Sequence, residues 1–161
     1  MSHANFLGFL MLQYDFDESM GYPVMMTSHA FGCALNEDLA RHGITFRQWQ
    51  VLAWLALETE LSQSDLAERM RIEAPTLAGI LDRMQRDGWI ERQSCPTDRR
   101  KKIVRPTDRV EPVWSKMVAC ARRVRTRACQ GIDPDDLEQL KQTLASIQEN
   151  LQSPCSVGEV V

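Results

Sequence analysis

The stretch from residue 61 to residue 106 constrains the fold most, because two helical patterns there precede two strand patterns. Ser62 suits the N-cap of the first helix, since its hydroxyl can accept a hydrogen bond from a free amide of the opening turn. Pro75 suits the first turn of the second helix, and Gly88 its end. The apolar residues recur every three or four positions. They are Leu66, Ala67 and Met70, followed by Leu77, Ile80, Leu81 and Met84.

The residues after Gly88 change to strand periodicity. Residues 89–93 and 101–105 are typical of strands, and residues 94–100 are typical of the turn between them. Helix, turn, helix and hairpin together predict a winged helix-turn-helix, in a fold that is mainly α with a small β-hairpin wing. The second helix of such a lobe lies in a DNA major groove, and the wing tip reaches phosphates or the minor groove.

The same stretch resembles the DNA-binding lobe of the MarR family of bacterial transcriptional regulators. The most specific segments are Leu81-Asp82-Arg83-Met84, Gly88-Trp89-Ile90-Glu91-Arg92 and Pro96-Thr97-Asp98-Arg99-Arg100. The order of predicted elements from about residue 21 to 151 also fits the family. The resemblance implies a homodimer that represses transcription by occupying a palindromic operator in double-stranded DNA, until a small-molecule effector releases it.

Charge distribution supports DNA binding although total charge does not. The chain has 161 residues and a net charge of −3, with a pI near 5.6. From Asp82 to Arg109, however, nine basic residues outnumber five acidic ones, which leaves +4 in that stretch. Such a local basic patch attracts phosphates whatever the overall pI.

Helical patterns flank this lobe on both sides. We expect one helix from about Tyr22 to His42, and a second that begins with the capping box of Thr45 and Gln48 and runs to about Glu58. A long helix is predicted from Thr107 to Gly131. A final one follows with an apolar seam spaced three and four residues apart. The seam consists of Leu137, Leu140, Leu144, Ile147 and Leu151.

These patterns predict four regions. Residues 1–20 form an N-terminal arm, and residues 61–106 form the winged helix-turn-helix lobe. Residues 21–60 and 107–152 form a helical dimerisation region with a supporting helix, and residues 153–161 form a flexible tail. The apolar helices at both ends of the chain predict the homodimer, because one lobe cannot bury all of them.

Several function classes find no support in the sequence. No motif of catalysis or of nucleotide binding occurs, so we expect neither an enzyme nor a cofactor. The longest apolar run, residues 6–12, is far short of the roughly 20 residues of a membrane span. Five cysteines without a CxxC pair indicate a reducing, cytoplasmic setting. His29 and Cys33 lie four residues apart on one helix, but two ligands alone make no metal site, so we predict a half-buried pair without metal.

The predicted DNA-binding residues lie at the helix-turn-helix and the wing. The resemblance implies arginine contacts from the wing, and the acidic residue before the arginines is expected to shape the wing. The family often has a polar or basic residue near the positions of Ala78 and Gly79, so this chain departs from it there and base readout by the helix is expected to be thin. The predicted residues are Ser62, Thr76, Ala78, Gly79, Arg83, Asp98, Arg99, Arg100 and Lys101.

The resemblance also implies an effector site between the dimerisation helices and the DNA lobe. By position alone, its residues are expected to be Met26, His29, Ala30, Trp49 and Trp114.

Two alternatives stay open. Cys95 lies in the wing near several cations, which lower a thiol's pKa, and it could make the protein a redox-sensing regulator. The winged helix could instead bind a protein, although the basic patch argues against this.

Overall fold

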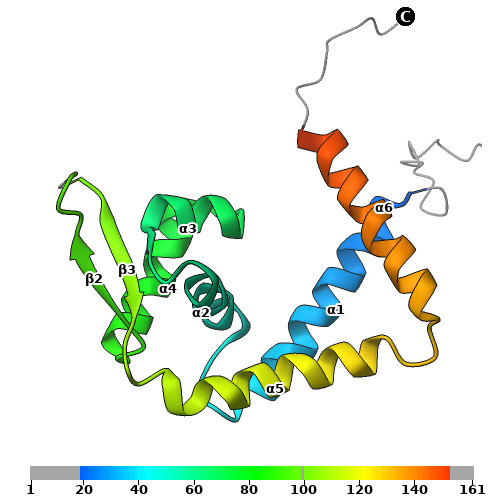
Figure 1. Cartoon of the computed structure of the whole chain (residues 1–161), viewed down its shortest axis with the longest axis horizontal. Helices are drawn as coiled ribbons and strands as arrows, with labels where there is room; N and C mark the ends of the chain where they lie inside the picture. The colour runs from blue at the N-terminus through cyan, green and yellow to red at the C-terminus, as the bar shows by residue number, and fades with distance from the viewer. Residues whose placement is uncertain (1–18, 99, 153–161) are drawn as a thin grey trace, which may run out of the picture.

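A computed structural model describes residues 19–98 and 100–152. Within them, six helices accompany one three-stranded antiparallel sheet, so the predicted fold class is confirmed (Figure 1). In chain order the elements are α1 (Gly21–Ala40), α2 (Phe46–Glu58), β1 (Leu61–Ser62), α3 (Gln63–Met70), α4 (Ala74–Arg86), β2 (Ile90–Ser94), β3 (Lys102–Pro106), α5 (Glu111–Ala128) and α6 (Pro134–Gln152). None of these helices is long and apolar enough to cross a membrane.

The core of the lobe lies where α2, α3 and α4 meet the sheet. Each fully buried aliphatic side chain contributes about 1.5–3 kcal/mol to folding, so this cluster holds the helix-turn-helix in one geometry. Its most buried members include Leu52, Leu55, Leu66, Leu77, Leu81, Met84, Ile90 and Val104.

Local capping signals are confirmed at the start of two helices. The Thr45 hydroxyl accepts a hydrogen bond from the Gln48 amide, and the Gln48 side chain accepts one from the Thr45 amide. The Ser62 hydroxyl accepts a hydrogen bond from the Asp65 amide at 3.2 Å. Gly88 follows α4 with φ +78°, a left-handed conformation that glycine adopts without strain.

The sheet contains a strand that the sequence patterns did not predict. The strand order is β1-β3-β2, and β1 pairs antiparallel with β3 through Leu61 opposite Val104. The expected helix start at Thr107 is wrong, because Thr107 closes the base of the wing instead. Its amide donates to the Trp89 carbonyl at 3.1 Å and its hydroxyl to the Gly88 carbonyl at 2.6 Å. The long helix α5 therefore begins only at Glu111.

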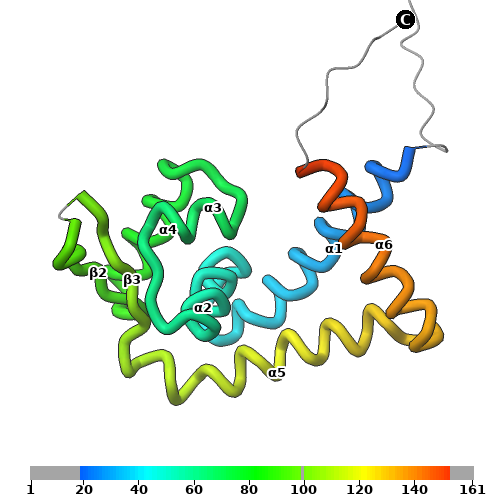
Figure 2. The backbone as a smooth tube through the Cα atoms, turned by 45° about the horizontal axis from the view of Figure 1, so that its top comes forward, coloured from blue at the N-terminus to red at the C-terminus, as the bar shows by residue number. Residues whose placement is uncertain are grey.

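Helix α5 leads away from the lobe toward a second group of helices. It packs against α1, and α1 and α6 both lie on the side of the molecule opposite the wing (Figures 1 and 2). Helix α6 has no buried residue, and residues 21–30 of α1 are all exposed. Large apolar side chains therefore remain uncovered on both helices, Phe31 (41% exposed) and Leu140 (51% exposed) among them.

Candidate nucleic-acid interface and neighbouring grooves

Helix α4 has one buried and one accessible face. Leu77, Ile80 and Leu81 are buried against the lobe, whereas Thr76 is exposed and Ala78 and Gly79 are half-buried. The accessible face of its first half therefore carries small side chains that allow another molecule to approach the backbone closely. Arg83, one turn later, is exposed.

Hydrogen bonds within the turn hold the tip of the wing. The Cys95 amide donates to the Lys101 carbonyl at 3.0 Å, and the Lys101 amide donates to the Asp98 carbonyl at 2.9 Å. The Asp98 carboxylate accepts a hydrogen bond from the Arg100 amide at 3.0 Å. Asp98 thus shapes the turn through a backbone amide. Arg99 lies outside the described residues.

Ion pairs occupy part of the basic patch. Arg92 pairs with Asp82 at 2.6 Å, Arg105 pairs with Glu60, and Arg86 approaches Asp87 at 3.4 Å. Lys102 and Arg109 form no ion pair, but Lys102 donates to the Ser94 hydroxyl at 2.9 Å and Arg109 donates to the Asp87 carbonyl at 2.8 Å. In the part of the chain that the structure describes, three exposed cations of the patch have neither an ion pair nor a hydrogen bond from the side chain. They are Arg83, Arg100 and Lys101.

Ser62 differs from the other predicted DNA-binding residues because it is only 4% exposed. Its hydroxyl contacts the Ser64 hydroxyl at 2.8 Å and caps α3. The structure therefore places this side chain inside the lobe, at the start of α3.

Cys95 lies at the wing with its sulfur 3.2 Å from the Thr97 hydroxyl. This hydrogen bond, followed by hydrogen bonds from the Thr97 and Asp98 amides, lowers the pKa of the thiol, while the charge of Asp98 opposes the shift. The expected cause was the neighbouring cations. The actual cause is local hydrogen bonding by the turn.

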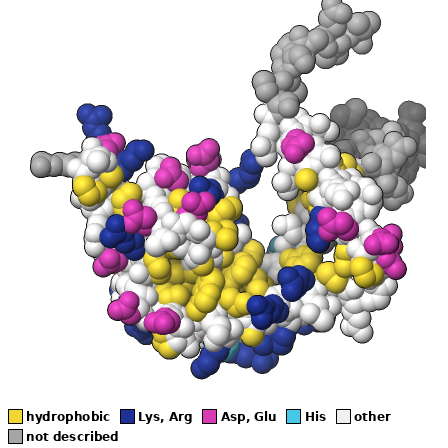
Figure 3. Space-filling view, viewed as in Figure 1, with side chains coloured by type: hydrophobic (Ala, Val, Ile, Leu, Met, Phe, Trp, Pro, Cys, Tyr) yellow, Lys and Arg dark blue, Asp and Glu magenta, His cyan; other side chains and the backbone are white. Residues whose placement is uncertain are grey.

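The five residues expected to line one effector site do not come together. Trp49 and Trp114 line a groove of about 410 Å³ between α2 and α5, which is part of the apolar surface at the centre of Figure 3. His29 lines a separate groove of about 550 Å³ between α1 and α2. Met26 and Ala30 are exposed on α1 and line neither groove.

The α2–α5 groove combines an aromatic floor with a basic rim. Ala53 and Val118 join the two tryptophans in the floor, and Arg122 and Arg125 stand at the rim. The Trp49 indole N–H is shielded from solvent and has no hydrogen-bond partner in the described part of the chain. The spacing of Val118, Arg122 and Arg125 puts them on one side of a helix, which was a usable signal for a basic rim beside an apolar surface. The sequence did not reveal that α2 lies opposite them.

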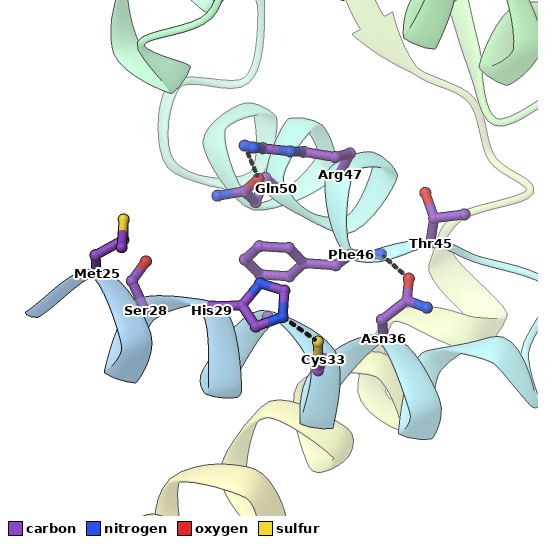
Figure 4. Close-up of a pocket in the computed structure, with 10 residues that line it drawn as sticks. Met25, Ser28, His29, Cys33, Asn36, Thr45, Phe46, Arg47 and Gln50 are labelled. Atoms are coloured by element: carbon purple, nitrogen blue, oxygen red, sulfur yellow. Dashed lines mark hydrogen bonds between the residues drawn. The ribbon is translucent and has the colours of Figure 1, made fainter. Parts of the chain in front are cut away.

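The α1–α2 groove is drawn in Figure 4. Phe46 forms its floor beside Gly32, and its ring stacks on Trp49 with centroids 6.3 Å apart. His29 and Cys33 lie at its edge with Nε2 and Sγ 3.4 Å apart. Both are exposed, so the expected half-buried pair is wrong for this chain. Among the described residues, no group of three or more His, Cys, Asp or Glu side chains could hold a metal ion.

Comparisons with known proteins agree with this geometry. Residues 42–101 match the sequence model of the MarR family. The chain is similar to the solved structure of the transcriptional regulator PA3341, with 30% identity and a TM-score of 0.75 over 83% of this chain and 98% of that one.

Two further structures share the fold at lower identity. A MarR-family transcriptional regulator from Rhodococcus sp. RHA1 is 22% identical, with a TM-score of 0.75 over 84% of this chain and 96% of that one. A mutant MarR from E. coli complexed with operator DNA is also 22% identical, with a TM-score of 0.74 over 79% of this chain and 91% of that one.

Proposed function

The chain belongs to the MarR family of winged-helix proteins, and we propose that it is a dimeric transcriptional regulator that binds double-stranded DNA. The observation that carries this proposal is the set of unpaired cations Arg83, Arg100 and Lys101 on the lobe that presents the accessible face of α4. In this proposal α4 enters the major groove, and the wing with Arg99 and Arg100 contacts phosphates or the adjacent minor groove. The similar fold of the E. coli protein bound to operator DNA supports this arrangement.

The roles within the interface follow from exposure. Thr76 offers a hydroxyl to a base edge or a phosphate, and the methyl group of Ala78 can contact a thymine methyl. Gly79 permits close approach, and Arg83 and Lys101 are suited to phosphates. Ser62 and Asp98 act indirectly, since the first caps α3 and the second shapes the turn of the wing.

The dimer would form through α1 and α6. Val24 and Phe31 are seven residues apart, on the side of α1 that farther along carries the buried Leu35. That face continues uncovered into the first half of α1, and the seam of α6 is likewise uncovered. A two-fold dimer through these faces would present two recognition helices to a palindromic operator with half-sites about one helical turn apart.

The effector proposed for this regulator is a small aromatic anion bound in the α2–α5 groove. Trp49 and Trp114 supply an aromatic floor, and Arg122 and Arg125 supply positive charge at the rim. A carboxylate would also offer an acceptor to the unpaired indole N–H of Trp49. Such a ligand would release a repressor only through a higher affinity for the conformation that does not fit the operator. Benzoate titration of the tryptophan fluorescence, with and without Arg122→Ala and Arg125→Ala, tests this site.

DNA binding is tested by fluorescence anisotropy with DNA from upstream of the protein's own gene, across a salt series. Arg99→Ala combined with Arg100→Ala should weaken binding by about 2–4 kcal/mol and reduce the slope of log K against log salt by about 2. Arg41→Ala combined with Arg127→Ala removes the same charge at exposed positions outside the wing and should leave binding unchanged. Equal affinities for the two double variants would contradict the wing assignment. Binding that does not depend on salt would indicate a protein partner instead.

A redox-sensing regulator is the second candidate, because hydrogen bonds lower the pKa of the Cys95 thiol at the wing. This mechanism predicts that the native protein loses DNA binding in peroxide and recovers it in reductant. The Cys95→Ser variant should keep its DNA binding in peroxide. Peroxide that leaves DNA binding of the native protein unchanged would reject it.

A further inference from the structure

A second groove adjoins the α2–α5 groove on the side toward the wing. It has a volume of about 300 Å³ and lies where the chain passes from β3 into α5. Ala56 and Trp114 line both grooves, and we call the two together the long groove. Binding sites for small molecules have volumes of about 300–1,000 Å³, and the long groove falls in this range.

One face of α5 runs along the whole of the long groove. The helical repeat puts five of its lining residues within roughly 80° of one another around the helix axis. They are Glu111, Trp114, Val118, Arg122 and Arg125. The helical rise separates Glu111 from Arg122 by roughly 16 Å along the axis. The long groove is therefore suited to an extended ligand that lies parallel to α5.

The two ends of the long groove carry opposite charges. Asp108 and Glu111 line the end toward the wing, and Arg122 and Arg125 line the other end. All four side chains are exposed, and among the residues that the structure describes none of them has an ion pair or a hydrogen bond from the side chain. Figure 3 shows the apolar surface with acidic side chains at its lower left and basic side chains at its right. Both charged ends are thus open to a ligand.

This arrangement selects among possible ligands. A carboxylate is suited to the arginine end, but a second carboxylate at the other end would be repelled by Asp108 and Glu111. A cationic group there would instead gain two acidic neighbours. The indole of Trp114 lies where the two grooves adjoin, so the part of the ligand between its charges would lie against an aromatic surface.

We propose that the effector is an elongated aromatic zwitterion. Its carboxylate binds at Arg122 and Arg125, its protonated amine binds at Asp108 and Glu111, and its aromatic body lies against Trp114. This proposal rests on the proposed effector groove and refines the class of its ligand. The opposite charges of the two ends also fix the direction in which the ligand lies.

The test compares two ligands with the same aromatic body by isothermal titration calorimetry of the full-length protein. Biphenyl-para-carboxylate carries only the anion, and the same molecule with an aminomethyl group on the far para carbon carries both charges. The zwitterion should bind about fivefold more tightly than the anion, which is the upper end of what an exposed ion pair contributes. This gain in affinity should decrease in high salt.

A variant at the acidic end and a matched control locate the gain. Asp108→Asn combined with Glu111→Gln should abolish it, and the affinity for the anion should stay the same or rise because the acidic charges are removed. Asp135→Asn combined with Asp136→Asn removes the same charge at exposed positions on α6, outside the long groove. This control should bind both ligands like the native protein.

Arg122→Gln combined with Arg125→Gln should weaken both ligands by a similar factor, because both carry the carboxylate. Equal affinities of the native protein for the two ligands, or a gain that survives loss of the acidic pair, would overturn the zwitterion and leave the proposed anion site in place. Binding of neither ligand would overturn both. DNA binding is measured without any ligand, so the outcome for the proposed regulator is separate from all of these results.

Discussion

Arg123 donates two hydrogen bonds to one carboxylate oxygen of Asp38, from Nε at 3.1 Å and from Nη2 at 3.0 Å. Nη2 also lies 3.2 Å from the sulfur of Cys120, whose thiol donates to the Asp38 carbonyl at 3.6 Å. These contacts join the C-terminal part of α1 to α5. The hydrogen bond to Asp38 is the main reason that the pKa of Arg123 is raised.

Breaking the Asp38–Arg123 pair should weaken the packing of α1 against α5. Asp38→Ala, Arg123→Ala and the double variant form a thermodynamic cycle, and we expect a favourable coupling free energy that decreases in high salt, because Arg123 is 57% exposed. Because the pKa of Arg123 is raised in the folded state, its contribution to the free energy of unfolding is present at every pH below the unfolded pKa. That contribution is lost only as pH rises through the higher folded pKa. The Arg123 contribution should therefore not change across the neutral range. Urea denaturation at two salt concentrations measures the cycle, with Arg127→Ala as the single-charge control.

Gly79→Ala should stabilise the lobe and weaken DNA binding. Glycine inside a helix costs about 0.5–1 kcal/mol relative to alanine. A Cβ at this position would meet only the flexible end of Arg83, at 3.8 Å. The free energy of unfolding should therefore rise by about that amount, while the new methyl group on the accessible face of α4 hinders close approach to DNA.

The control for this prediction is Ala78→Gly, which makes the opposite change at the adjacent position. It should lower the free energy of unfolding by about the same amount. Denaturation curves and operator titrations of both variants give the answer. A Gly79→Ala protein that is more stable and binds operator as tightly as the native protein would place Gly79 away from the DNA.

Much of the fold was predictable because its signals are local. The hydroxyls of Ser62 and Thr45 and the glycine at position 88 each act within one turn of their own position, so sequence alone located them. The strand β1 was not predictable, because Leu61 and Ser62 form a strand only by pairing with the distant β3. The start of α5 was misplaced for the same reason, since Thr107 bonds to the carbonyls of Gly88 and Trp89.

The candidate sites show the same division. Periodicity correctly separated the buried Leu77 and Leu81 of α4 from its accessible Thr76. Two of the residues expected at one effector site line different grooves, because a groove depends on how helices cross. Trp49 on α2 faces α5, whereas His29 on α1 faces α2.

The pKa of Cys95 should depend on Thr97. The Thr97 hydroxyl and amide stabilise the thiolate, so the pKa is lowered and the alkylation rate of Cys95 should begin to rise at a lower pH than that of a free thiol. Thr97→Val removes the side-chain hydrogen bond and should move the profile to higher pH. Iodoacetamide labelling followed by mass spectrometry measures the rate at Cys95 itself. Identical profiles in the two proteins would show that this hydrogen bond does not set the reactivity.

The seam of α6 should hold the dimer together. Leu140 is 51% exposed, Leu144 is half-buried, and they lie one turn apart on a helix with no buried residue. Each leucine buried by a partner would contribute about 1.5–3 kcal/mol to association. Leu140→Glu combined with Leu144→Glu should therefore produce monomers, as measured by sedimentation equilibrium.

The same double variant separates dimer formation from folding and from DNA recognition. Its lobe should remain folded, because α6 contributes nothing to the buried core of the described residues. Its operator affinity should fall. In a dimer, binding of one half-site makes binding of the second an intramolecular step, whereas a monomer contacts only one half-site. Gln142→Glu combined with Ser146→Glu adds the same charges at the same spacing on the other face of α6, and it should remain dimeric. Monomers in both variants would mean that charge alone, and not the apolar seam, decides assembly.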